Sequence, residues 1–142
     1  MLLEEPVEHL AVVDPLDSGD PLESYVHARR DLVEVWEQNG RPASGPWSGL
    51  NVLFAPAPDE LWAFCSYEGE HGHNLCDDSQ PYYQMTYQET PSGLVVGSEP
   101  FDDHSETWNP LPNGHYLRGR IHKDRILLEK GSLPVPAPIL TR

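Results

Sequence analysis

The sequence predicts an α+β fold in which one main helix accompanies an antiparallel sheet of about six strands. Two observations support this class. Apolar residues recur at three- and four-residue spacing between Pro21 and Gln38, which is typical of an amphipathic helix. After Ser48 the apolar runs become short and several alternate with a period of two, which indicates strands. One helix followed by short strands favours a helix packed on an antiparallel sheet.

The helix is expected to begin at Pro21 and to end at Gln38. Asp20 can act as the N-cap, and proline is favoured at the first helical position because its missing N–H would have no intrahelical partner there. Asn39 and Gly40 supply the stop signal. The apolar residues of the predicted helix are Leu22, Tyr25, Val26, Leu32, Val33 and Trp36.

The strands are expected to form hairpins. The runs 51–55 and 61–65 are separated by a short proline-containing turn, which predicts two antiparallel strands. A half-buried strand over 82–88 and a strand over 94–97 follow, and 116–121 with 125–129 form a last hairpin. Residues 1–19 are expected to form an N-terminal segment, 20–130 the α+β domain and 131–142 a proline-rich extended tail.

The charge balance disfavours nucleic-acid partners. Nine Lys and Arg against 23 Asp and Glu give a net charge of −14, which repels phosphate backbones. Residues 41–112 hold eleven acidic residues and one basic residue, whereas 113–142 hold two acidic and six basic residues. Neither a signal peptide nor an apolar run of membrane-spanning length is visible. We therefore expect a cytoplasmic protein with reduced cysteines and without nucleic-acid or membrane partners.

The segment 70–78 contains a weak sequence signal for a metal site. His71, His73 and Cys76 are three possible zinc ligands, and the neighbouring aspartates could orient the imidazoles. The fourth ligand would have to come from elsewhere, and no Cys-x-x-Cys pair is present. A polar, glycine-containing connection between strands explains the same residues without a metal, so we expect neither a metal nor another cofactor.

Neither cysteine is expected to act as a nucleophile. Cys65 ends an apolar run and is expected to be a small buried core residue. Cys76 is followed by Asp77 and Asp78, and nearby negative charge raises the pKa of a thiol. The carboxylates of Glu99, Asp102 and Asp103 could perform acid and base chemistry, but a solvated loop leaving a strand is the favoured interpretation, because nothing else in the sequence marks a cleft.

The run from Leu94 to Asp103, followed by 106–117, resembles the end of the class II glutamine amidotransferase family. A strand ending in Val-Gly-Ser-Glu-Pro precedes an Asp-Asp pair, a Trp and a turn into the last strands. The segment 49–63 also resembles the hairpin of this family. The residues of the family-motif loop are Ser98, Glu99, Pro100, Asp102, Asp103 and Trp108.

The resemblance implies part of the four-layer αββα sandwich of N-terminal nucleophile hydrolases. One helix and most of one sheet are expected from this chain. In that family the nucleophile is a cysteine at the mature N-terminus, whose α-amino group serves as the base, whereas this chain has Leu2 after its Met. No catalytic residue is therefore expected in the isolated chain, and no substrate-binding residue is assigned.

The resemblance predicts a class II amidotransferase-like protein without the N-terminal nucleophile, either a split subunit or an inactive remnant. A split subunit would pair with an amidotransferase front half, or the chain would form a homo-oligomer. The alternative hypothesis is a small acidic protein-binding module with an aromatic sheet face. The aromatic residues of that face would be Trp62, Tyr82, Tyr83, Tyr87 and Trp108.

Overall fold

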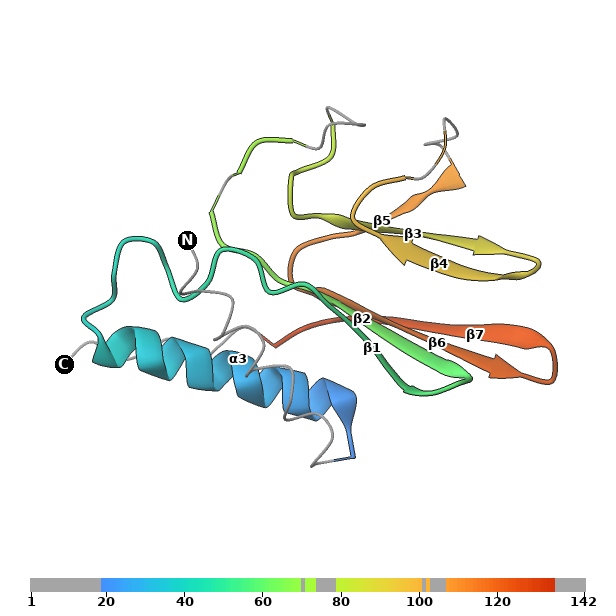
Figure 1. Cartoon of the computed structure of the whole chain (residues 1–142), viewed down its shortest axis with the longest axis horizontal. Helices are drawn as coiled ribbons and strands as arrows, with labels where there is room; N and C mark the ends of the chain where they lie inside the picture. Colours follow the sequence, from blue (N-terminus) through green and yellow to red (C-terminus); the bar gives the residue numbers. More distant parts are fainter. Residues whose placement is uncertain (1–18, 70, 74–78, 101, 103–106, 135–142) are drawn as a thin grey trace. The chain divides into compact units, whose positions relative to one another are not determined.

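A computed structural model describes residues 19–69, 71–73, 79–100, 102 and 107–134. These residues form two compact units. The first unit comprises 19–47 together with 133–134, and the second is Ser48–Ser132. Figure 1 shows the single described helix in the first unit and all of the described strands in the second.

The first unit is built on helix α3, Pro21–Gln38, whose bounds are those that the sequence predicts. The Asp20 side chain accepts hydrogen bonds from the backbone N–H groups of Leu22 and Glu23, at 3.1 and 3.4 Å. At the other end the N–H of Arg41 donates to the carbonyl of Trp36 at 3.0 Å, while Gly40 has a φ of 83°. This is a Schellman termination, in which glycine takes the left-handed position at little steric cost.

A buried arginine links the helix to two other parts of the first unit. The guanidinium of Arg29 lies 6.0 Å from the ring centre of Tyr25 and 5.6 Å from that of Trp47. Its Nη1 donates to the carbonyl of Pro134 at 3.0 Å. Cation–π contacts and this hydrogen bond offset part of the cost of removing the charge from water. The expected tail over 131–142 is described only as far as Pro134.

The second unit contains two antiparallel sheets. The four-stranded sheet has the order β1-β2-β6-β7, and the three-stranded sheet has the order β4-β3-β5. The strand bounds are β1 Val52–Ala57, β2 Glu60–Cys65, β3 Met85–Thr90, β4 Gly93–Gly97, β5 Asn109–Leu111, β6 His115–His122 and β7 Arg125–Ser132. Neighbouring strands in the chain form three hairpins, β1–β2, β3–β4 and β6–β7.

Two prolines lie on edge strands. Pro56 is in β1, where the register with β2 shifts between Phe54 and Ala57, and Pro110 is in β5. Proline cannot donate a hydrogen bond to a neighbouring strand, so it is tolerated at sheet edges and irregularities. The two edge positions explain how these strands contain proline without losing their pairing.

One apolar core joins the two sheets of the second unit, whose ribbons lie one above the other in Figure 1. Its fully buried members come from both sheets: Ala63, Cys65 and Leu117 from the four-stranded sheet, and Met85, Tyr87 and Leu111 from the three-stranded sheet. Leu94, Val96 and Leu128 pack against this cluster. The two sheets therefore face each other across a shared layer, as in a β-sandwich.

Strand β2 is buried on both of its faces. Ala63 and Cys65 are 1% and 0% exposed on the face that carries the shared core. Trp62 and Phe64 point to the opposite face, since side chains alternate along a strand, and they are 4% and 1% exposed. Burial on both sides explains why the run Leu61–Cys65 is apolar without interruption instead of alternating.

The prediction of one sheet of about six strands is corrected to seven described strands in two sheets. The period of two identifies strands but does not say which strands pair, and β3 pairs with β4 and β5 instead of joining β2. The short strand β5 was missed because Asn109 and Pro110 disfavour strands. Strand β3 begins at Met85, later than predicted, because Tyr82 and Tyr83 lie in a turn before it.

The β6–β7 hairpin ends in a two-residue loop. Lys123 and Asp124 have φ values of 51° and 61°, which is the left-handed region required by a type I′ turn. Ile121 pairs with Ile126, and His122 with Arg125, directly before this turn. The predicted turn is confirmed, and its tight geometry brings basic residues of the C-terminal part of the chain to one hairpin tip.

Candidate functional site

The family-motif loop leaves strand β4 and is fixed by hydrogen bonds. The buried side chain of Gln80 donates from Nε2 to the carbonyls of Gln84 and Ser98, at 2.7 and 2.9 Å. Further along, Nε1 of Trp108 donates to Oδ1 of Asp102 at 3.1 Å, and Trp108 is 8% exposed. These contacts give Asp102 and Ser98 a role in holding the loop.

The other residues of the motif loop do not form a described acid–base pair. Glu99 and Pro100 are half-buried and follow Ser98 directly. Asp103 lies outside the described residues, so the predicted Asp102–Asp103 pair has one described member. The Asp102 carboxylate already accepts the indole N–H of Trp108. The described part of the loop is therefore a structural element that connects the end of β4 to β5.

The two histidines considered as weak metal-ligand candidates take part in other contacts. His71 donates from Nε2 to the backbone carbonyl of Glu68, and its ring stands edge-on to Tyr83. His73 forms an isolated antiparallel bridge with Pro81. Cys76 lies outside the described residues. Within the residues that the structure describes, no group of three His, Cys, Asp or Glu side chains is placed to hold a metal ion.

The described cysteine is a core residue. Cys65 is fully buried, and Sγ lies 3.5 Å from the carbonyl of Tyr83. Burial raises the pKa of its thiol to about 11, because the thiolate would lose its hydration, while a backbone hydrogen bond from Met85 opposes this shift. The thiol is therefore protonated at neutral pH, and its position in the core leaves no path for a substrate.

The aromatic residues of the alternative hypothesis do not form one exposed face. Trp62, Tyr87 and Trp108 are 4%, 4% and 8% exposed, whereas Tyr82 is 50% exposed and Tyr83 is half-buried. Trp62 and Tyr87 also belong to different sheets. Among these five side chains, only the Tyr82–Tyr83 pair is available at the surface.

A network of aromatic and charged side chains covers the second face of the four-stranded sheet. The ring of Trp62 stacks on Phe64 and Tyr116, with ring centres 5.8 and 5.9 Å apart. The guanidinium of Arg118 lies 4.8 Å from the ring centre of Trp62. Oε2 of Glu60 accepts hydrogen bonds from Nε1 of Trp62 at 2.6 Å and from Nε of Arg118 at 2.8 Å.

This network sets the electrostatics of Glu60. Partial burial alone would raise the pKa of the Glu60 carboxyl. The hydrogen bonds from Arg118 and Trp62, together with the charges of Arg118 and Arg120, outweigh that effect and hold the pKa below its usual range. Glu60 is thus a structural anion that orients Trp62 and Arg118.

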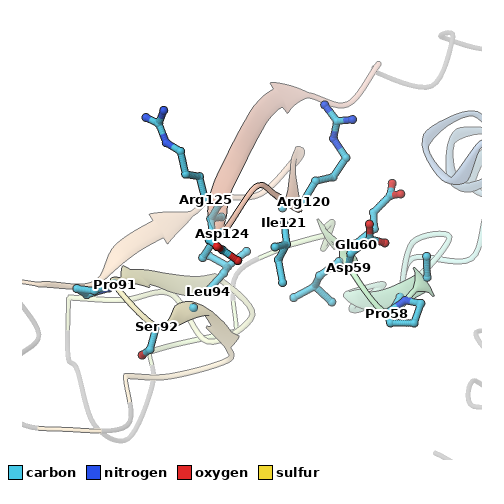
Figure 2. A pocket seen from close by; sticks show the side chains of 16 residues that line it. Pro58, Asp59, Glu60, Pro91, Ser92, Leu94, Arg120, Ile121, Asp124 and Arg125 are labelled. Atoms are coloured by element: carbon cyan, nitrogen blue, oxygen red, sulfur yellow. The ribbon is translucent and has the colours of Figure 1, made fainter.

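A cavity of about 440 Å³ opens where the tips of the three hairpins converge (Figure 2). Apolar side chains that line it include Leu61, Leu94, Ile121 and Ile126. Leu94 of β4 can lie on the four-stranded sheet because position 119 is glycine. A Cβ atom there would be 2.6 Å from Cδ2 of Leu94. The cavity therefore has an aliphatic floor where the two sheets of the second unit meet.

Charged residues surround this floor. Asp59 and Asp124 lie in the turns, and Figure 2 shows the side chains of Arg120 and Arg125 extending away from each other. The one hydroxyl among the lining residues, Ser92, lies 3.2 Å from Oγ1 of Thr90. The aliphatic floor is suited to holding an apolar group, and the charged residues lie at its margin.

Comparisons with known proteins identify no similar protein. No protein-family model, curated protein or solved structure matches the chain. Among the described residues no helix combines the length and the apolar character that a membrane span requires.

The sequence pattern did not reveal the hairpin-tip cavity. Its lining comes from three turns that are far apart in the chain, and their convergence depends on the packing of one sheet on the other. Ile121 lies shortly before the type I′ turn, and its side chain is 56% exposed. Single exposed aliphatic residues are common on protein surfaces, so Ile121 gives no local signal for the cavity.

Proposed function

We propose that residues 20–130 form the second half of a class II glutamine amidotransferase-like domain, the half that does not carry the nucleophile. The observation that carries the proposal is the burial of strand β2 on both faces, within two antiparallel sheets that share a core. A strand that is buried on both faces is expected in an inner layer of a layered fold. The two facing sheets correspond to the two central layers that the resemblance implies in an αββα sandwich.

The distribution of the strands over two sheets is compatible with the proposal and changes one of its expectations. The sequence alone suggested that this chain supplies most of one sheet. With β1, β2, β6 and β7 in one sheet and β3, β4 and β5 in the other, we infer that the chain supplies strands to both central layers. The family-motif loop then joins β4 and β5 of the three-stranded sheet, and the chain passes to the other sheet between β5 and β6.

The chemistry of the described residues favours a non-catalytic role for the chain by itself. Hydrolysis of a γ-glutamyl amide through an acyl-enzyme needs an accessible nucleophile with a base beside it. Cys65 has neither property, because it is buried and its pKa is raised to about 11. We therefore assign the nucleophile, an N-terminal cysteine in this family, to a segment outside these 142 residues.

The expected partner is a polypeptide segment with the amidotransferase nucleophile and the glutamine-binding residues, acting in the cytoplasm. The net charge of −14 keeps nucleic acid unfavourable as a partner in this proposal. The basic residues of 113–142 would instead suit contact with an acidic neighbour. No acceptor for the released ammonia is assigned, because the described residues contain no feature that identifies one.

Retrieval of the partner tests the proposal. The chain would be tagged, expressed in the cells from which it comes, and purified with whatever binds to it. A glutamine-derived diazoketone, which alkylates a cysteine nucleophile that binds glutamine, would then be added to the complex. We expect the adduct on the N-terminal cysteine of the partner and none on Cys65. Retrieval of a partner that the reagent does not label would contradict the proposal.

A further inference from the structure

A second cavity of the second unit, of about 400 Å³, is lined mainly by aromatic rings. Four of them, Tyr67, His71, Tyr82 and Tyr83, define what we call the aromatic cup. The rings of His71 and Tyr82 stand at 89° and 87° to the ring of Tyr83, with centres 4.7 and 5.0 Å away. The ring of Tyr67 lies at 30° to that of Tyr83, 6.0 Å away. The cup therefore has walls in two nearly perpendicular orientations.

The central ring of the cup is held by its surroundings. Gly49 lies directly against it, since a Cβ atom at position 49 would be 2.5 Å from Cε1 of Tyr83. The side chain of Asn51 donates from Nδ2 to the carbonyl of Tyr83 at 2.7 Å, and its Oδ1 accepts from the N–H of Ser66 at 3.0 Å. Asn51 thus ties the turn before β3 to the end of β2.

The walls of the cup are also held. Asn113 forms two hydrogen bonds of 2.8 Å with the backbone of Tyr67, one to its carbonyl and one from its N–H. The N–H of Tyr82 donates to the carbonyl of Gly72 at 3.1 Å, and His71 donates to the carbonyl of Glu68. Rings positioned by such contacts lose little conformational freedom when a ligand binds.

The cup is open to solvent at an apolar surface. The side chain of Tyr82 is 50% exposed, and His71 is exposed beside it. The carbonyls of Glu68 and Tyr83 already accept hydrogen bonds from His71 and Asn51. Apart from the three tyrosine hydroxyls, the surface offered to a ligand therefore consists mainly of ring faces and edges.

The stretch of sequence that supplies the cup residues is acidic. No Lys or Arg occurs between Arg41 and Arg118, and eleven Asp and Glu lie in that stretch, from which all cup residues come. Elsewhere the protein places its own cations on rings, as with Arg118 on Trp62 at 4.8 Å and Lys130 on Tyr87 at 5.8 Å. The net charge of −14 on the chain favours a cationic ligand over an anionic one.

We propose that the aromatic cup binds the quaternary ammonium group of a small soluble compound. Such a group carries a delocalised positive charge, a methyl-covered surface and no hydrogen-bond donor, so aromatic rings stabilise it well. A primary ammonium would instead need directed acceptors to replace its water. The volume of about 400 Å³ suits one small ligand. The site is independent of the amidotransferase proposal, because no residue of the cup belongs to the family-motif loop.

The test is an NMR titration of the full chain with choline and with dimethylbutanol, the uncharged isostere in which carbon replaces nitrogen. We expect choline to shift the ring resonances of Tyr67 and Tyr82, and its own methyl signal to move upfield. Choline should bind at least about fivefold more tightly than the isostere, as cation–π contacts with two or more rings require. Equal affinity of the two compounds, or no shift with choline, would overturn the proposal.

Two variants of Tyr82 and one control separate the role of the ring from effects on folding. Tyr82→Phe keeps the ring and should bind choline within about twofold of the parent, whereas Tyr82→Leu should weaken binding at least about fivefold. Ile121→Ala, at an equally exposed apolar residue of the hairpin-tip cavity, should leave choline binding unchanged. A folded Tyr82→Leu variant with unchanged affinity would contradict the proposal.

Free choline and the same group on a lipid are distinguished by sedimentation with phosphatidylcholine vesicles. We expect the chain to stay in the supernatant, since the proposed ligand is a small soluble compound. If the chain sediments with the vesicles and added choline prevents this sedimentation, the cup binds a lipid headgroup. That result would overturn the assignment to a soluble compound.

Discussion

Successive residues of β2 point to opposite faces of the four-stranded sheet, and the two faces are stabilised in different ways. Ala63 and Cys65 lie in the core shared with the three-stranded sheet, among apolar side chains. Trp62 lies on the other face, where its ring stacks on Phe64 and its indole N–H donates to Glu60. All of these side chains of β2 except Glu60 are buried. The shared core therefore depends on volume, and the second face on charge and hydrogen-bond geometry.

The contribution of apolar packing in the shared core and the contribution of charge on the second face can be separated by experiment. Substitutions in the shared core should act through lost volume and should change little with pH. Substitutions in the network around Glu60 should act through charge and should depend on pH. Three substitutions and one measurement of thiol reactivity test how the two faces are built, and they are ordered by the size of the effect expected.

Truncation of the shared core should have the largest effect. Leu117 is 1% exposed and packs between the two sheets of the second unit, so Leu117→Ala should lower the free energy of unfolding by about 3 kcal/mol. Urea denaturation followed by tryptophan fluorescence measures the change. Leu127→Ala is the matched control in the neighbouring strand, because Leu127 is 42% exposed. If Leu117→Ala lowers the free energy of unfolding no more than Leu127→Ala does, the shared core is contradicted.

Protection of the Cys65 thiol should be the next largest effect. Its pKa of about 11, against roughly 8.5 for a free thiol, leaves at least about 100-fold less thiolate at pH near 8 in the folded chain. In a Cys76→Ala background only Cys65 can react, and alkylation by iodoacetamide should be at least that much slower in buffer than in urea. The same rate in both conditions would show that the thiol is accessible.

A methyl group added at Gly131 should disturb the second face. A Cβ atom there would lie 2.5 Å from Cε1 of Tyr116, whose ring is stacked on Trp62 and cannot move freely. Gly131→Ala should therefore destabilise the chain by about 2 kcal/mol. Gly93→Ala provides the control, because a Cβ atom at position 93 meets nothing within 4 Å. Equal melting temperatures for the two variants would contradict the packing of Tyr116 on Gly131.

Removal of the charge of Glu60 should have the smallest effect and the clearest pH dependence. Because the folded chain lowers the pKa of Glu60, the carboxylate stabilises the fold above its ordinary pKa, and the contribution disappears as the pH falls through the lowered value. Glu60→Gln should cost about 1 kcal/mol at neutral pH. The difference from the parent should shrink in acid, below a pH of about 4.

The exposed residue Glu89 offers the control for this experiment. Glu89→Gln should leave the free energy of unfolding nearly unchanged, since a solvated carboxylate contributes little. A difference between Glu60→Gln and the parent that persists in acid would place the effect in packing instead of charge.

The helix and the hairpins could be predicted from sequence because their signals are local. Asp20 and Gly40 lie at the ends of α3 and mark its bounds, and the β6–β7 hairpin follows from two strand-like runs separated by a short polar segment. The pairing of β3 with β5 could not be predicted in this way. This pairing joins strands that are far apart in the chain, and such pairing has no local sequence signal. The proline in β5 also weakened the evidence that residues 109–111 form a strand.

The candidate sites were less predictable than the fold. The burial of Cys65 follows from its apolar neighbours in the sequence and is confirmed. The aromatic cup was missed, because Tyr82 and Tyr83 were assigned to a strand. Their position in a turn depends on Gly49 and Asn51, which are more than thirty residues away along the chain. Contacts of that kind have no periodic signal in the sequence.

The rate of glutamate release from glutamine tests the central claim most directly. It would be measured on the purified chain and on the complex retrieved with its partner. The account predicts no release by the chain alone, and release by the complex that stops when the diazoketone labels the N-terminal cysteine of the partner. Release by the chain alone that is lost in Cys65→Ala or Cys76→Ala would place the nucleophile within these 142 residues and would contradict the account.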